Sequence, residues 1–471
     1  MTTTPFSKDQ LRARFVGKTL HHVPTPSIVL DLAKVEANCN LMLEAAQRLQ
    51  LNWRAHIKTH KTAELTRLQV GDNDNTPVNI VVSTLTEGEN VLPLLREYQE
   101  RGRKVNMLYS FPLYPSSIDR LAAMSSQLGP DGLTVMIDHI DQVKLLTSLA
   151  SKSGNPPLVF LKVNIGSNRA GVPPNTPECA ALIRELLLSE TVGSAIFWGV
   201  YSHAGHSYGS RKDWEAMGVL GVEFAGLHDV ARAVQAERPT HPLVLSVGAT
   251  PTVTTLQHPD FHTDGTTNGG ASDGAVTAQI KDLIARMRAD GLTLEVHAGV
   301  YPTLDVQQLA AHARDATSLN PSAIAVTVLA EVSSIYPGRG ANGTSEAIVN
   351  AGCIALGREP CEDKGEVKGQ HYNAFGIVMP WAGVRNVVPG PEFPAVHGGW
   401  QAARLSQEHG VLAWRGDMEA ETPLVAGQRV RIWPNHSCIT GAAYPYYLVV
   451  DSRLRGREDE IVDVWTRWNG W

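Results

Sequence analysis

Eight short apolar segments alternate with helical segments between residues 51 and 298, and no other feature of the sequence constrains the fold as much. The segments are Leu51–Ile57, Val78–Val82, Lys104–Tyr109, Leu133–Asp138, Leu158–Asn164, Ala195–Ser202, Pro242–Val247 and Leu292–Ala298. Strands separated by helices predict an α/β fold with right-handed crossovers, and eight strands close a TIM-like (β/α)8 barrel. An open doubly wound sheet is the alternative, but it calls for a glycine-rich first turn, and residues 56–61 do not form one.

The pattern changes after about residue 320, where short strand-like segments are joined by connections rich in glycine, proline and charge. We therefore expect a barrel domain over residues 25–320 and a C-terminal all-β domain over residues 321–471, with residues 1–24 joined to the β domain. The strand-like segments are Ile324–Ser333, Glu346–Ala355, Asn373–Met379, Gly410–Trp414, Gln428–Trp433 and Tyr446–Val450.

The composition excludes several classes of partner. The chain has 471 residues and a formal net charge of −6, which argues against nucleic acid and against anionic membranes. Its five cysteines are odd in number and scattered, so they predict no disulfide framework and indicate a reducing compartment. No apolar run reaches the length of a membrane span, and residues 1–22 hold none of signal-peptide length. We therefore expect a cytoplasmic protein without a membrane partner.

Residues 257–274 interrupt the alternation with a stretch rich in His, Asp, Thr and Gly. Long segments of this kind are often functional. His258, Asp260 and His262 are possible metal ligands, but a solvated polar loop is the simpler interpretation of the same residues.

The first of the eight segments leads into the sequence RAHIKTHK at residues 54–61, where apolar and polar residues alternate. Both faces of a strand are usually covered in an α/β protein, so we expect the polar face to point into a built site. Lys58 falls at the carboxyl end of this strand, where barrel active sites form. A lysine crowded by cations and partly dehydrated favours the neutral amine that attacks an aldehyde. Lys58 is therefore a candidate Schiff-base lysine, with a solvated or phosphate-binding lysine as the alternative.

Other strand ends carry residues suited to an anionic or planar ligand. Arg169, between glycines after the fifth segment, has paired donors for a phenolate or carboxylate, although a turn-capping surface arginine has the same pattern. Tyr201 and Tyr208, at the end of the sixth, offer aromatic rings to cover a planar cofactor, and a core tyrosine is the alternative for Tyr201. Small residues at 246–252 and 297–301 expose amides that suit a phosphate, or form tight structural turns.

His436 and Cys438 lie in the predicted β domain, just beyond Gln428–Trp433. Residues at i and i+2 point the same way in an extended segment, and imidazole with thiolate suits zinc. A lone His-x-Cys pair also arises by chance. Two ligands fall short of a structural zinc site, so a metal here would leave positions for water or substrate, as catalytic zinc does.

Taken together, these features resemble the alanine-racemase-like (fold type III) pyridoxal-phosphate enzymes over roughly residues 24–451. The lysine sequence at 54–61 and the sequence PTPS at 24–27 are similar to those of D-serine dehydratases and D-threonine aldolases. The His436-x-Cys438 pair and SQEHG at 406–410 resemble the eukaryotic-type D-serine dehydratases. D-threonine aldolases pair the metal histidine with an aspartate, so Cys438 favours the resemblance to the dehydratases.

The resemblance implies pyridoxal 5′-phosphate and Zn2+ as cofactors. Lys58 would hold the cofactor aldehyde, and Arg169 would face the cofactor's 3′-oxygen. His297 stands where alanine racemases place an arginine against the pyridine nitrogen. The remaining implied positions are Tyr201 and Tyr208 next to the cofactor, Gly248, Thr250, Gly299 and Val300 around its phosphate, and His436 and Cys438 at the zinc.

The activity that the resemblance implies is that of a D-serine ammonia-lyase, a carbon–nitrogen lyase that eliminates water from D-serine and gives pyruvate and ammonia. D-threonine aldol cleavage and D-threo-3-hydroxyaspartate dehydration are alternatives with the same cofactor. A non-catalytic pyridoxal-phosphate-binding protein is an alternative of another class. We also expect a homodimer, because members of this superfamily commonly dimerise.

Overall fold

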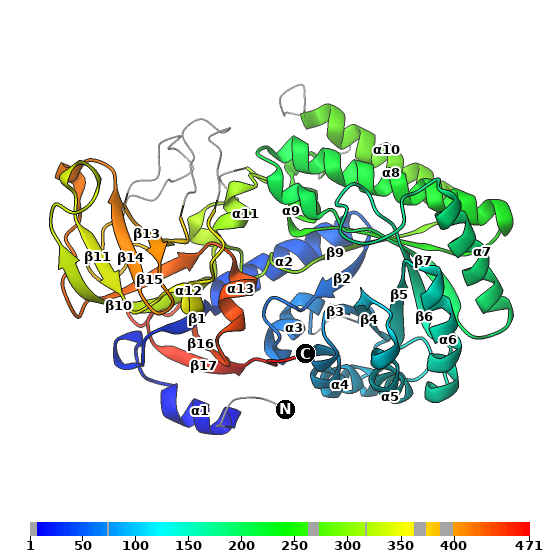
Figure 1. Ribbon diagram of the computed structural model, residues 1–471, viewed down its shortest axis with the longest axis horizontal. Coiled ribbons are helices and arrows are strands. Elements are labelled where there is room, and N and C mark those ends of the chain that lie inside the picture. The colour runs from blue at the N-terminus through cyan, green and yellow to red at the C-terminus, as the bar shows by residue number, and fades with distance from the viewer. Residues whose placement is uncertain (1–6, 73–74, 262–272, 316–317, 362–373, 387–398) are drawn as a thin grey trace. The chain divides into compact units, whose positions relative to one another are not determined.

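The computed structural model describes residues 7–72, 75–261, 273–315, 318–361, 374–386 and 399–471. These residues divide into two compact units, which we call the barrel unit and the sheet unit (Figure 1). The barrel unit comprises described residues of 40–299 with 470–471, and the sheet unit comprises those of 7–39 and 300–469. Residues 25–39 and the described part of 300–320 belong to the sheet unit, although the sequence analysis assigned them to the barrel domain.

Eight parallel strands close on themselves in the barrel unit, which confirms the predicted barrel. They are β2 (Asn52–His56), β3 (Val78–Val82), β4 (Val105–Pro112), β5 (Leu133–Ile137), β6 (Leu158–Lys162), β7 (Ile196–Tyr201), β8 (Val244–Val247) and β9 (Thr293–Ala298). The ring closes because β2 pairs with both β3 and β9. Each strand lies in its predicted segment, and only β4 runs clearly beyond it, to Pro112.

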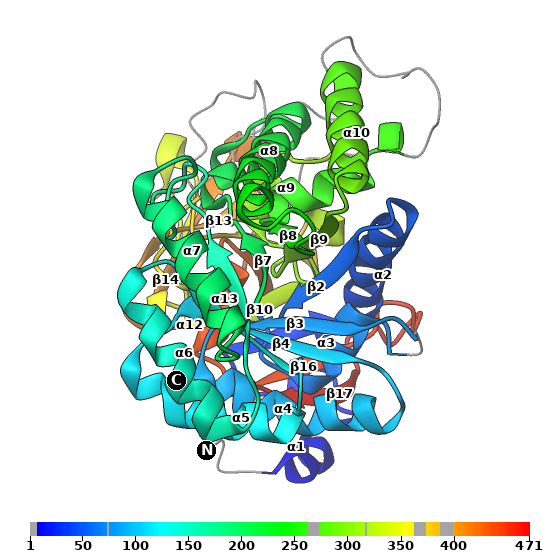
Figure 2. The same ribbon diagram turned by 90° about the vertical axis from the view of Figure 1, so that its right-hand side faces the viewer.

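Helices surround the outside of this barrel (Figure 2). Three of them begin after a threonine, Thr62, Thr84 or Thr176, whose side chain accepts a hydrogen bond from the backbone N–H three residues later. The helices predicted at 140–151, 177–189 and 213–235 are present, and each ends slightly later than predicted. The helices are α3 (Ala63–Val70), α4 (Leu85–Glu100), α5 (Ile118–Leu128), α6 (Ile140–Ser153), α7 (Pro177–Thr191), α8 (Asp213–Glu237), α9 (Thr250–Thr254) and α10 (Asp273–Ala289).

The segment predicted as a long loop begins with two short 3-10 turns, η4 (Thr255–Gln257) and η5 (Pro259–Phe261). His258 lies between them, with a carboxylate oxygen of Asp213 and one of Asp260 each 3.7 Å from its ring nitrogens. His262 lies outside the described residues, as do the residues up to 272, so the loop interpretation stays a prediction there.

A polar layer is buried inside the barrel. Arg54 Nε donates to Glu295 Oε1 at 2.6 Å, which joins β2 to β9. Arg54 Nη1 donates to Asn106 Oδ1 in β4 at 2.7 Å and to Ile80 O in β3 at 3.2 Å. Thr134 in β5 donates to the same Asn106 oxygen at 2.9 Å. The polar face of the first strand therefore points into the barrel, as predicted.

The sheet unit contains a mostly antiparallel nine-stranded sheet in the order β11-β14-β13-β12-β15-β10-β1-β16-β17. Because β10 also pairs with β11, six of these strands close into a ring. The strand β1 belongs here, between β10 and β16, rather than with the barrel. The strands are β1 (Ser27–Asp31), β10 (Val326–Tyr336), β11 (Glu346–Val349), β12 (Gly376–Val378), β13 (Gly399–Leu405), β14 (Gly410–Arg415), β15 (Arg429–Pro434), β16 (Tyr446–Val450) and β17 (Ile461–Thr466).

The prediction of one strand over Glu346–Ala355 is wrong, because β11 ends at Val349 and a short helix, α12 (Cys353–Leu356), follows. Gly352 permits this bend, since a Cβ there would lie 2.4 Å from the carbonyl oxygen of Gln407. The predicted strand Asn373–Met379 is found as the shorter β12, and Asn373 lies outside the described residues.

Two strands were not predicted at all. In β13, the register shifts between Ala402 and Arg404, so the strand does not keep a period of two. In β17, buried and half-buried residues do not alternate, and its pairing with β16 also shifts register. Irregular strands of this kind lack the periodicity on which sequence prediction depends.

The described part of the N-terminal segment packs on this sheet. Ser7 and Gln10 cap α1 (Lys8–Phe15) reciprocally, and Leu11 and Phe15 are buried in a cluster with Ile461 of β17. The other helices of the sheet unit are α2 (Leu32–Arg48), which continues into the barrel unit, α11 (Val306–Ala310) and α13 (Ser437–Ala442). None of the helices in the described residues has the length and apolar character needed to cross a membrane.

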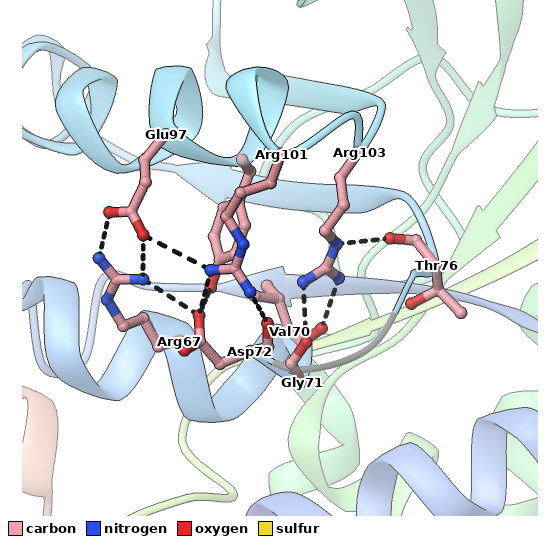
Figure 3. A network of polar contacts seen from close by, with 9 residues as sticks. Arg67, Val70, Gly71, Asp72, Thr76, Glu97, Arg101 and Arg103 are labelled. Carbon is pink, nitrogen blue, oxygen red and sulfur yellow. Dashed lines mark hydrogen bonds and ion pairs between the residues drawn. The ribbon is translucent and has the colours of Figure 1, made fainter.

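A network of arginines stabilises the amino-terminal side of the barrel, between α3 and α4 (Figure 3). Arg103 is 5% exposed and donates to three carbonyl oxygens, those of Val70, Gly71 and Thr76, at 2.8–3.0 Å. The first two are at the end of α3, where carbonyl groups have no partner within the helix. Arg101 in the same network is more exposed and donates to Asp72 O at 2.6 Å.

We predict that Arg103→Met lowers the free energy of unfolding by about 2–3 kcal/mol, because it removes the buried donor of three carbonyl groups, of which that of Val70 is buried and those of Gly71 and Thr76 are partly buried. The matched control Arg101→Met should cost less than about 1 kcal/mol, because its contacts are solvent-exposed. Urea unfolding followed by circular dichroism measures both. Equal losses for the two variants would contradict the assignment of Arg103 as the helix-capping residue.

Candidate active site

A cavity of about 520 Å³ opens where the barrel strands end at their carboxyl side, a volume typical of small-molecule sites. Three predicted site residues, Lys58, Arg169 and Tyr201, line it together. The other lining residues are His56, Ser83, Ser110, Phe111, Pro112, Asp138, Lys162, Ala170 and His203. The structure therefore gathers the predicted Schiff-base lysine, arginine and tyrosine at one site, at the predicted end of the barrel.

Lys58 lies in the turn two residues beyond β2, so strand β2 fixes the direction in which it leaves the barrel. Its neighbour His56 has a pKa well below the usual range, because the ring is buried and because Lys58 is close. His60 does not join the site, since its Nε2 pairs with Gln69 Oε1 at 2.8 Å. Lys61 also turns away and forms an ion pair with Glu87 at 3.1 Å.

Lys162 is a second lysine in the cavity, and the sequence analysis missed it. It is the last residue of β6, and its Nζ lies 4.4 Å from the centre of the Tyr201 ring. Burial lowers the pKa of Lys162 to about 7, and the charge of Arg169 acts in the same direction. The sequence contained a signal for Lys162, namely a lysine at the end of an otherwise apolar strand. Lys58 was identified from its position at a strand end in the same way.

Arg169 is exposed at the cavity and has no ion-pair partner among the described residues. Its loop is held by Asn164, whose Oδ1 accepts from the amides of Gly166 and Asn168 at 3.2 and 3.0 Å. Gly171 is needed because a Cβ there would lie 2.8 Å from the Asn164 nitrogen. This glycine lets the loop return to β6.

Tyr201 stacks on His297, with ring centres 4.1 Å apart and planes at 9°. Ser246 Oγ lies 3.0 Å from Nδ1 of His297, and Nε2 of His297 is buried without a partner among the described residues. Burial holds the pKa of His297 well below its usual range, so this ring is neutral. A buried nitrogen without a partner is unusual, and the pyridine nitrogen of a bound cofactor would supply one.

His203 also lines the cavity in a neutral state. Burial and the charge of Lys162 hold the pKa of His203 well below its usual range, and its Nδ1 donates to Gly248 O at 2.7 Å. Gly248 has φ +147°, and a Cβ there would lie 2.2 Å from the carbonyl oxygen of His297. Only glycine fits at this position between β8 and β9.

The remaining predicted cofactor residues do not line the cavity. Tyr208 is half-buried in η3 (Gly205–Gly209), and Thr250 is buried at the start of α9. Gly299 lies close to His56, since a Cβ there would be 3.1 Å from the His56 Cβ. Val300 is buried in the sheet unit. Their contact with a cofactor stays a prediction.

His436 and Cys438 are in contact in the sheet unit, but not in an extended segment as predicted. His436 is the residue before α13, and Cys438 is in the first turn of that helix. His436 Nδ1 also makes a short hydrogen bond to Glu359, which leaves Nε2 as the nitrogen for a metal. Burial alone would lower the pKa of His436, but Cys438, Asp305 and Glu359 raise it to about 10.

No group of three or more His, Cys, Asp or Glu side chains is arranged around a metal position in the part of the chain that the structure describes. The His436–Cys438 pair nevertheless fits zinc in its donor types, one imidazole nitrogen and one sulfur. The surrounding carboxylates favour positive charge at this place, and Glu359 orients the imidazole as carboxylates orient zinc-bound histidines.

The barrel and its lysine-bearing cavity define the class of protein. Residues 30–272 match the family described as alanine racemase, N-terminal domain, and residues 325–450 match the putative serine dehydratase domain. The chain thus belongs to the alanine-racemase-like enzymes, a family that implies pyridoxal 5′-phosphate as cofactor, and the unpartnered Nε2 of His297 fits that group.

Within that class, the chain belongs to the D-serine dehydratase family. It is 36% identical to the D-serine dehydratase of Schizosaccharomyces pombe over 99% of this chain and 96% of the relative. It is 31% identical to that of Saccharomyces cerevisiae, over 98% and 99%. The solved D-threo-3-hydroxyaspartate dehydratase from Delftia sp. HT23 has a TM-score of 0.70 and 25% identity, covering 96% of this chain and 100% of that one. A cysteine-to-alanine variant of it, solved in a metal-free form, has the same TM-score and identity.

We predict that Lys162→Met stabilises the cofactor-free protein most at low pH. Because the pKa of Lys162 is lowered from 10.5 to about 7, the unfolded chain binds more protons between these values, and stability rises with pH across that window. The cost of burying the charged amine is therefore complete below pH 7. The variant should gain on the order of 5 kcal/mol near pH 6, and the pH-dependent gain should fall below about 1 kcal/mol near pH 10.

Urea unfolding of both proteins near pH 6, 8 and 10 measures this difference. A gain that is the same at all three values would reflect only the apolar character of methionine. It would contradict the lowered pKa.

Proposed function

We propose that this protein catalyses the pyridoxal-phosphate- and zinc-dependent elimination of water from D-serine, which gives pyruvate and ammonia. The observation that carries the proposal is Lys58 in the barrel cavity of a chain that is similar, over nearly its whole length, to two proteins named D-serine dehydratase. Atoms balance without a co-reactant, because the water lost in elimination is regained when the enamine product hydrolyses.

Lys58 is the proposed attachment point of the cofactor and the base that takes the Cα proton. In both roles its nitrogen acts as a neutral amine, and Lys162 and Arg169 lie in the same cavity. Pyridoxal phosphate, when bound, supplies an electron sink for charge at Cα, and zinc supplies a Lewis acid for the departing hydroxyl.

The other cavity residues have proposed binding roles. Arg169, which has no carboxylate partner among the described residues, is suited to the cofactor's 3′-oxygen, and its guanidinium can donate twice. Tyr201 and His297 form a flat aromatic pair with which a planar ring can align, and Nε2 of His297 can pair with the pyridine nitrogen. Tyr208, Gly248, Thr250, Gly299 and Val300 remain proposed cofactor contacts on the family resemblance.

His436 and Cys438 are the proposed zinc ligands, with the other coordination positions open to water or substrate. Support comes from their mutual contact and from the Glu359 hydrogen bond that fixes the imidazole. A cytoplasmic homodimer is also part of this proposal, on the basis of the family resemblance.

D-threo-3-hydroxyaspartate is the second candidate substrate, because the solved Delftia relative is named for its dehydration. The cations of the cavity would accept its additional carboxylate. Products distinguish the candidates: D-serine gives pyruvate and ammonia, hydroxyaspartate gives oxaloacetate and ammonia, and aldol cleavage of D-threonine gives glycine and acetaldehyde.

We predict that, among these three substrates, D-serine gives the highest kcat/KM. Lys58→Ala should lower it by about a thousandfold or more and remove the visible absorbance of lysine-bound cofactor, because both the attachment point and the base are lost. Lys58→Arg keeps the charge but supplies no nucleophilic amine, so it should fail equally. Turnover that survives in either variant would rule out the role of Lys58, and a cofactor-bound protein inert to all three substrates would favour a non-catalytic carrier.

We predict that His436→Ala and Cys438→Ala each lose most of the bound zinc. Glu359→Gln should weaken zinc binding by about tenfold or more, because the imidazole is no longer oriented by a carboxylate. Cys353→Ala is the matched control, since Cys353 donates only to the Gln407 carbonyl oxygen at 3.8 Å. Metal analysis after dialysis, and competition with a chelator, measure the affinities.

Removal of zinc should abolish elimination and leave the cofactor absorbance in place. Activity that survives exhaustive chelation would contradict the proposed role of the metal.

A further inference from the structure

Glu223 in α8 is fully buried, and its carboxyl group connects the ends of two barrel strands with α9. Oε1 accepts from Ser202 Oγ, just beyond β7, at 2.8 Å and from the amide of Gly248, just beyond β8, at 3.3 Å. Oε2 lies 3.4 Å from Thr252 Oγ1 in α9. These contacts fix the backbone from Gly248 to Thr252, which we call the β8 turn.

The hydrogen bonds around Thr252 depend on the protonation state of Glu223. Thr252 Oγ1 accepts from the amide of Ala249 at 3.0 Å and lies 3.2 Å from Ala249 O, so it neighbours two acceptors with only one hydroxyl proton. If Glu223 is ionised, the hydroxyl proton serves either the carboxylate or Ala249 O. If Oε2 carries a proton, it donates to Thr252, and the hydroxyl donates to Ala249 O. Only the neutral acid lets every contact form at once.

The surroundings of Glu223 also favour the neutral acid. Its three contacts are an amide and two hydroxyls, and no cation forms an ion pair with it among the described residues. Burial raises the pKa of Glu223 to about 7, although the three donors and the more distant Lys162 act in the opposite direction. The other ionisable groups near it are Tyr201 of β7 and, across the Gly248 carbonyl, His203, which is neutral.

We propose that Glu223 is a positioning residue that shapes the β8 turn as a neutral acid and couples binding of the cofactor's phosphate to the uptake of a proton. The inference rests on the proposed function, in which Gly248 and Thr250 of this turn receive the phosphate. An ionised carboxylate behind the turn would repel the phosphate and lose one hydrogen bond. Affinity for the phosphate should therefore be complete at low pH and fall as the pH rises through the pKa of Glu223.

The ligand for the test is pyridoxamine 5′-phosphate, because it has no aldehyde and does not react with Lys58. Its Kd is measured by fluorescence titration of the cofactor-free protein near pH 6 and near pH 8.5, for the wild type and for Glu223→Gln. Glutamine has the shape and the hydrogen bonds of the neutral acid and cannot ionise. Taking the ratio of the two Kd values at each pH cancels the ionisation of the ligand and of Lys58.

We expect the two proteins to bind equally near pH 6, and the wild type to bind about tenfold more weakly than Glu223→Gln near pH 8.5. A ratio that does not change with pH would overturn the coupling and leave the proposed cofactor intact. A pH effect that persists in Glu223→Gln but vanishes in Lys162→Met would assign it to Lys162 and overturn the role of Glu223. A wild type that does not bind the ligand at either pH would overturn the proposed cofactor and the coupling together.

Thermal unfolding without ligand tests the protonation state itself. Glu223→Gln should raise Tm already near pH 6, where the unfolded glutamate is ionised and the folded one is neutral, and raise it further near pH 8.5, where the folded glutamate carries the buried charge. Glu295→Gln is the matched contrast, because Glu295 is equally buried but pairs with Arg54, so its loss of charge should lower Tm at both values. If Glu223→Gln lowers Tm at both values as Glu295→Gln does, Glu223 is an ionised structural residue and the proposal fails.

Discussion

The structure depends first on the buried ion pair that closes the barrel. Arg54 of β2 and Glu295 of β9 come from strands 241 residues apart in the sequence, and their side chains meet inside the ring at 2.6 Å. The same guanidinium donates hydrogen bonds to β3 and β4, and its acceptor in β4, Asn106, also accepts from Thr134 in β5. Since a buried charge without its partner costs several kcal/mol, the pair specifies one register for the closing strands. Lys58 is four residues from Arg54, so this register also sets where the lysine leaves the barrel.

Above that layer, basic side chains outnumber carboxylates. Near the carboxyl ends of the strands, the cavity lining has three basic side chains, Lys58, Lys162 and Arg169, and one carboxylate, Asp138. Asp138 is already engaged, because it accepts from the amide of Gly171 at 3.0 Å and from Gln142 at 3.0 Å. Among the described residues, the basic side chains of the cavity therefore form no ion pair with a carboxylate. An anionic ligand supplies the missing negative charge, and until it binds, burial favours the neutral form of Lys162.

How much of this could be predicted from the sequence depends on how local each feature is. The barrel strands were predictable because each is a short apolar run between helices, and Lys58 was predictable because it follows the first of them. It could not be predicted to which sheet β1 belongs, because the sequence SIVLD suits a barrel strand as well as a strand of the other sheet. Its pairing with β10 and β16 places it in the sheet unit. The strand β13 was missed because its bulge breaks the alternation, and the His436–Cys438 pair was placed in an extended segment because a helix of six residues leaves too short a periodic signal.

Glu223 and Glu295 show why the electrostatics of the site were the least predictable part. Both are glutamates with almost no exposure, one in helix α8 and one in strand β9, and neither sequence neighbourhood indicates which groups the carboxylate contacts. Glu295 contacts a guanidinium from a distant strand, whereas Glu223 contacts two hydroxyls and an amide. The first environment pairs the carboxylate with a cation at 2.6 Å, and burial in the second raises the pKa of Glu223 to about 7. The barrel thus combines an ion-paired layer that fixes its geometry with an upper layer in which Glu223 and Lys162 have pKa values near neutrality, so the upper layer can respond to the charge of a ligand.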